Sequence, residues 1–74
     1  MDRQELWDLL ARAEQHLREA DRTVQRHEEI LEALSKSGHD LTHANEVLAM
    51  YKQTQARLRA ERDRLRAELE NLEG

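Results

Sequence analysis

The four histidines are the side chains of this 74-residue chain best suited to bind a metal ion or to change charge near neutral pH. His39 and His43 stand four residues apart with Asp40 between them, and two imidazoles one helical turn apart can share a divalent cation. The glutamate and the third ligand of a zinc-protease helix are missing. We therefore interpret this segment as a polar turn and expect neither a metal nor another cofactor.

The other two histidines fall on or beside an apolar helical face. His27 occupies a position on that face, and His16 stands next to it. We expect His27 to pack in the core. A pH-sensing role is the alternative, because a histidine buried in its neutral form would loosen the structure when mild acid protonates it.

The densest group of charges is an arginine run, with five arginines among residues 57–66. Such a run can follow the phosphates of RNA or DNA, as in dimerising helical hairpins of the ROP type, an analogy of fold alone. However, carboxylates are interspersed at helical spacing, no aromatic side chain stands in the run to stack a base, and the formal net charge of the chain is -4. We therefore interpret the run as a salt-bridged, solvated face. A nucleic-acid-binding dimer is the alternative, and its contacts would be Arg57, Arg59, Arg64 and Arg66.

The composition favours long helices and gives catalysis little support. Charged and apolar residues each make up 38% of the chain, proline and cysteine are absent, and glycine occurs twice. A disulfide-stapled fold and an all-β domain are therefore excluded. No nucleophile stands in a pattern with a base, so we expect no enzyme and no catalytic residue. Since no apolar run could span a membrane and no signal-peptide pattern follows Met1, we expect a cytoplasmic protein.

The candidate residues lie on two predicted helices that are separated by a turn at Gly38. Turn-forming residues cluster around Gly38, which can adopt the left-handed conformation that ends many helices. Asp40 is placed to cap the following helix, and Asp2 to cap the preceding one. The chain is therefore predicted to be one all-α domain over residues 1–74, with helices at about 3–36 and 41–72 and a turn at 37–40.

Apolar residues recur in both predicted helices at alternating steps of three and four, the heptad pattern of a coiled coil. When the chain is folded back at Gly38, core positions whose numbers sum to 75 face each other, which predicts an antiparallel two-helix hairpin. In this seam His27 faces Leu48 and Tyr51 faces Val24, and we expect both rings to be in the core. The other predicted layers are Leu34–Leu41, Leu31–Ala44, Ala20–Gln55, Leu17–Leu58, Ala13–Arg62, Leu10–Leu65 and Leu6–Leu69.

The two flanks of this seam differ in charge. On one flank the first helix carries Trp7, Glu14, Asp21 and Glu28 and the second carries Lys52, Arg59 and Arg66, so a row of acids is predicted to run beside a row of bases. The other flank is far less charged. Because a core of this size usually needs a staple and cysteine is absent, we expect a homodimer that closes a four-helix bundle. The predicted contact residues are Leu9, Ile30, Val47 and Met50, with Trp7 as a secondary anchor.

Three short motifs carry a resemblance to other proteins. They are Gly38-His39-Asp40, the spacing of Ala44, Leu48 and Tyr51, and Arg62-Asp63-Arg64-Leu65. Over about residues 12–70 the chain resembles a group of short, uncharacterised proteobacterial proteins, many of them from rhizobia, in which a phenylalanine takes the place of Tyr51. The resemblance implies a bacterial, cytoplasmic helical hairpin and supplies no activity. The residues themselves predict a non-enzymatic module for protein–protein contact, with a second copy or another helical protein as the partner.

Overall fold

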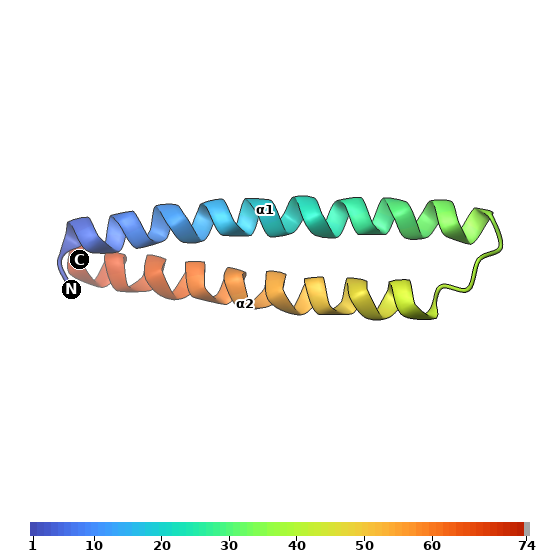
Figure 1. Ribbon diagram of the computed structural model, residues 1–74. Helices are drawn as coiled ribbons and strands as arrows, with labels where there is room; N and C mark the ends of the chain where they lie inside the picture. The colour runs from blue at the N-terminus through green and yellow to red at the C-terminus, as the bar shows by residue number, and fades with distance from the viewer. Residues whose placement is uncertain (74) are drawn as a thin grey trace.

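The computed structural model describes residues 1–73 and consists of two long helices that lie side by side (Figure 1). Helix α1 spans Arg3–Lys36 and helix α2 spans Thr42–Glu73. The helices run antiparallel and form a rod of 54 × 15 × 14 Å, with the start of α1 and the end of α2 at one end and the turn at the other. The all-α antiparallel hairpin predicted from the heptad pattern is therefore confirmed.

The end of α1 is fixed by a glycine-dependent cap. Gly38 has a φ of +74°, which is the left-handed conformation that glycine adopts without a steric penalty. The amide of His39 donates to the carbonyl of Leu34 at 3.2 Å, and the amide of Gly38 donates to the carbonyl of Ser35 at 3.2 Å. This pair of bonds is the Schellman motif, and it satisfies carbonyls that the helix end would otherwise leave without partners.

Aspartates cap the start of both helices. The side chain of Asp2 accepts from the amide of Glu5 at 2.8 Å, and that of Asp40 accepts from the amide of Thr42 at 3.0 Å and from its hydroxyl at 2.8 Å. These bonds lower the pKa of Asp40, the backbone bond most, because they stabilise the charged carboxylate. The first turn bond of α2 runs from the amide of Asn45 to the carbonyl of Leu41, so the helix begins at Thr42, one residue later than predicted.

Burial is uneven along the rod. The buried side chains are all apolar residues of the predicted seam: Leu6, Leu10, Ala13, Leu17, Val24, Leu48, Leu65 and Leu69. Five of them, together with the half-buried Leu9, form one cluster at the end that holds the termini. Toward the turn, Leu31, Leu34 and Leu41 are only half-buried, so the core of the hairpin is concentrated at its terminal end.

The prediction that His27 and Tyr51 are core residues is wrong. His27 is half-buried and Tyr51 is 38% exposed, whereas Val24 and Leu48 beside them are buried. The two rings pack on each other instead, with centroids 4.6 Å apart and planes inclined by 30°. This arrangement gives each ring an apolar neighbour and leaves its polar atoms near water, so the structure avoids burying polar groups without partners.

Candidate protein-interaction surface

One flank of the seam is closed by ion pairs between the helices. We call this the charged flank; carboxylate and cation lie 3.2 Å apart in Glu14–Arg66, 3.7 Å in Glu28–Lys52 and 4.0 Å in Asp21–Arg59. The prediction that acids of one helix run beside bases of the other on this flank is therefore confirmed. Since the paired side chains are about half exposed, each pair contributes only ~0.2–1 kcal/mol, and their main effect is to select the antiparallel register.

The long polar side chains of the seam also turn toward the charged flank. Gln55, predicted to lie over Ala20, donates from its side-chain nitrogen to Asp21 across the hairpin at 2.7 Å. Arg62, predicted to lie over Ala13, places its guanidinium 2.9 Å from Asp63. Both polar heads thus bond at the surface and leave the opposite side of the seam to smaller residues.

The opposite flank, here called the open flank, has a different character. No ion pair between the helices crosses it within residues 1–73, and its His16 and Glu61 are both exposed. Ile30 is 43% exposed and the neighbouring Met50 is 66% exposed. The remaining residues of this flank are half-buried, apart from the exposed Thr54; they are Leu9, Thr23, Val47 and Glu68.

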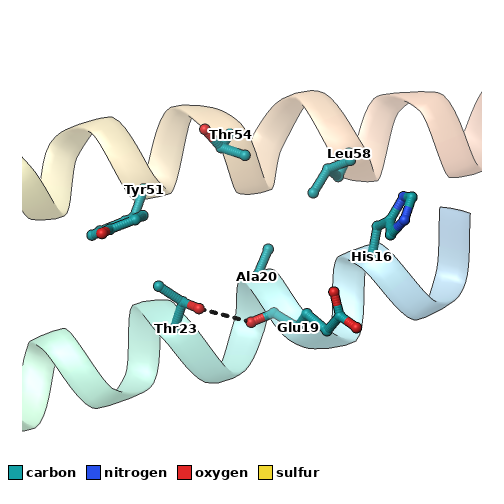
Figure 2. A pocket seen from close by; sticks show the side chains of 7 residues that line it. All are labelled: His16, Glu19, Ala20, Thr23, Tyr51, Thr54 and Leu58. Carbon is teal, nitrogen blue, oxygen red and sulfur yellow. Dashed lines mark hydrogen bonds between the residues drawn. The ribbon is translucent and has the colours of Figure 1, made fainter.

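A groove of about 330 Å³ lies at the middle of the open flank (Figure 2). Small side chains at Ala20, Thr23 and Thr54 create it, because they leave space that larger residues of the seam would fill. The hydroxyl of Thr23 donates to the carbonyl of Glu19 at 3.0 Å, so its methyl group is free to face the groove. The complete lining is His16, Glu19, Ala20, Thr23, Tyr51, Thr54 and Leu58.

This groove was not predicted, although the sequence contains a signal for it. The layer predicted to join Ala20 to Gln55 pairs an alanine, one of three in the seam, with a polar residue, and Thr23 faces Thr54 next to it. A gap opens when the polar side chain turns to the far flank, as Gln55 does. Adjacent layers of small residues in a heptad seam therefore predict a groove.

The five predicted contact residues lie in three places. Ile30, Val47 and Met50 are neighbours in the half of the open flank nearer the turn, and Leu9 packs beside the core cluster at the terminal end, roughly 30 Å away along α1. Trp7 is 47% exposed and lies on the charged flank, where it lines a shallow pocket with Arg66 and other residues. A partner that covers the open flank would therefore leave Trp7 uncovered.

Three of the four arginines predicted as an alternative nucleic-acid face are held by carboxylates. Arg59 and Arg66 form the interhelical pairs described above. Arg64 lies 2.6 Å from Glu68 and also bonds Glu61, and these contacts raise the pKa of Arg64 and lower that of Glu61. Arg57 forms no ion pair with any of residues 1–73.

The part of the chain that the structure describes contains no cluster of three or more histidine, aspartate or glutamate side chains that could hold a metal ion. His39 and His43 are both exposed beside the turn. Neither α1 nor α2 contains an apolar stretch long enough to cross a membrane.

Comparison with known proteins does not extend this description. No family model matches the chain, and neither the curated proteins nor the solved structures contain a match. The resemblance to rhizobial proteins therefore stays a prediction that rests on its three short motifs, and any function must be argued from the surface of the hairpin itself.

Proposed function

We propose that this protein is a non-enzymatic helical module that associates with a second copy of itself through the open flank. The observation that carries the proposal is the contrast between the two flanks. The charged flank satisfies its polar groups within one chain, whereas the open flank exposes Ile30 and Met50 and surrounds an unfilled groove.

The amount of core in one hairpin supports the same conclusion. Among the described residues 1–73 only eight side chains are buried, and the turn half contributes Val24 and Leu48 alone. A single small core of this kind supplies few kcal/mol against the entropy of ordering the chain. A second hairpin on the open flank would cover the half-buried leucines near the turn and complete a four-helix bundle.

Nucleic-acid binding is less well supported. A phosphate contact by Arg59, Arg64 or Arg66 would have to displace a carboxylate that already pairs with the arginine. The formal net charge of -4 also opposes the approach of a polyanion.

Light scattering over a range of protein concentrations tests the proposal directly. The chain has a mass of 8.8 kDa, and we expect twice that value at high concentration, with dissociation on dilution. Circular dichroism recorded on the same samples controls for unfolding. A helical monomer at every concentration would refute self-association, and the open flank would then be the docking surface for a different helical protein.

A further inference from the structure

Two opposite charges on the open flank, one at the middle of each helix, limit how two copies can pack on each other through this flank. Glu19 stands at the middle of α1, whose bounds are Arg3–Lys36, and Arg57 stands at the middle of α2, whose bounds are Thr42–Glu73. Both side chains are exposed, and both occupy the heptad position that borders the open flank. Neither forms an ion pair within residues 1–73.

Two-fold symmetry allows two ways to place one open flank fully on another. If the two turns lie at the same end of the bundle, α1 of one copy lies on α2 of the other. If the turns lie at opposite ends, α1 lies on α1 and α2 lies on α2. In both arrangements a residue at the middle of a helix lies at the middle of the bundle. Only the residue that it faces on the other copy differs, so the two arrangements can be compared at this height.

With the turns at opposite ends, like charges meet. Glu19 faces its own copy and Arg57 faces its own copy at the centre of the bundle, and Arg12 falls near the partner's Arg26. Toward the ends, Val47 falls near the partner's Glu68 while Ile30 falls near the partner's Leu9, so the charges, not the apolar contacts, distinguish the two arrangements. Juxtaposed like charges oppose a complex and are a common means of suppressing a wrong arrangement.

With the turns at the same end, opposite charges meet. Glu19 faces the partner's Arg57, and two-fold symmetry produces this pair twice. Arg12 falls at the height of the partner's Arg64, whose charge is already paired with Glu61 and Glu68 in a cluster that carries one net negative charge. Near the turn, Ile30 meets an apolar residue of the partner.

The contact near the turn illustrates this match. Ile30 lies at the height of the partner's Val47, and Met50 lies at the height of the partner's Arg26, whose aliphatic stem can cover it. The small side chains around the groove allow the two copies to approach closely at mid-length.

The area of the flank favours full overlap. A face of 54 by 15 Å has an outline of about 800 Å², which is what each partner buries in an interface of standard size. A staggered dimer that overlapped only at the turn half would bury about half of this area and would leave Leu9 uncovered.

We propose that two copies of this chain pack open flank to open flank with their turns at the same end, held in that orientation by two Glu19–Arg57 pairs between the copies. This inference rests on the proposed self-association and specifies its geometry. The arrangement makes the four-helix bundle polar along its length, with both turns at one end and all four chain termini at the other.

A single spin label in the turn tests the orientation, because the chain has no cysteine of its own. His39→Cys places one label in each turn, and pulsed dipolar EPR measures the distance between the labels of a dimer. We expect a distance near the width of a bundle, roughly 20 Å, because neighbouring helix axes are 8–10 Å apart. A distance close to the 54 Å length of the rod would overturn the orientation and leave self-association intact. The absence of a dipolar signal, with a monomeric mass, would instead refute the proposed function.

Charge reversal tests the pair itself. Glu19→Arg and Arg57→Glu should each raise the dimer Kd about 2- to 30-fold, since two exposed ion pairs are lost in each dimer. The double variant should return the Kd to within about threefold of the original, because both pairs reform with reversed polarity. Glu46→Arg is the matched control, an exposed acid on the outer face of α2. Losses that simply add in the double variant would refute the pairing of these two residues.

Discussion

Met50 gives the most direct test of the open flank as an interface. It is 66% exposed in the single hairpin, and burying an apolar side chain of this size fully is worth about 1.5–3 kcal/mol. If the dimer covers the exposed part, Met50 contributes about 1–2 kcal/mol in each copy and about 2–4 kcal/mol in the dimer. Met50→Gln removes this contribution with little change in side-chain length or ordering entropy, so the dimer Kd should rise about 30- to 700-fold.

Sedimentation equilibrium over a dilution series measures this change. The helical content of the variant should equal that of the parent, because glutamine is a good helix former and residue 50 contributes little to the hairpin core. Ala60→Gln is the matched control, since it places the same side chain at an exposed position on the outer face of α2. A Kd for Met50→Gln within about threefold of the control would show that the exposed apolar surface is not buried on association and would refute the argument from the open flank.

Three further predictions concern the hairpin itself. Leu65→Ala should lower the free energy of unfolding in urea by about 2–5 kcal/mol because Leu65 is only 2% exposed, whereas Leu72→Ala, at a side chain 50% exposed, should change it far less. Gly38→Ala should destabilise by about 1–2 kcal/mol through the φ of +74° alone, since an added Cβ meets no atom within 4 Å, and Gly38→Asn should restore part of the loss in thermal unfolding. The pKa of Asp40 lies below its ordinary 3.8, so its cap stabilises the fold above that pH and is lost as the pH falls; the stability difference between the parent and Asp40→Ala should therefore disappear in an acid titration.

The heptad pattern was sufficient to predict which helix faces meet and which charges pair. Because the Cβ direction follows from the position in the heptad, folding the chain at Gly38 places Glu14, Asp21 and Glu28 beside the correct bases. An error of one residue in register would place uncharged residues opposite all three acids, so the charge match itself indicates the register. The turn was predictable for a similar reason, since Gly38 and Asp40 each have a conformational or bonding preference that no neighbour shares.

The directions that side chains take beyond Cβ could not be predicted from the heptad pattern. Tyr51 and His27 occupy seam positions, yet their rings turn to stack on each other, because the choice of rotamer depends on where each polar atom can find water. The groove has the same origin. It depends on the direction that Gln55 takes, and Asp21, one residue beyond Ala20, attracts that amide to the far flank. The residue types alone do not show which flank a polar side chain of the seam will turn toward.

Self-association and nucleic-acid binding would both use Arg57, which can pair with only one anionic partner at a time. It is the one arginine of the proposed nucleic-acid face that pairs with no carboxylate in residues 1–73, and the same-end dimer would give it Glu19 of the partner subunit. A dimer of this kind would have few free cations in the run for phosphates. Each phosphate contact contributes about 0.9 to the slope of log affinity against log salt. Even if both Arg57 side chains of a dimer left Glu19 for a phosphate, they could account for a slope of about 2 at most. A steeper slope measured by fluorescence anisotropy with a labelled RNA duplex would mean that the arginines leave their carboxylates on binding, and it would overturn the assignment of the run as a salt-bridged face. If the slope is shallow and Arg57→Gln weakens the dimer rather than RNA binding, the residue acts between the two copies.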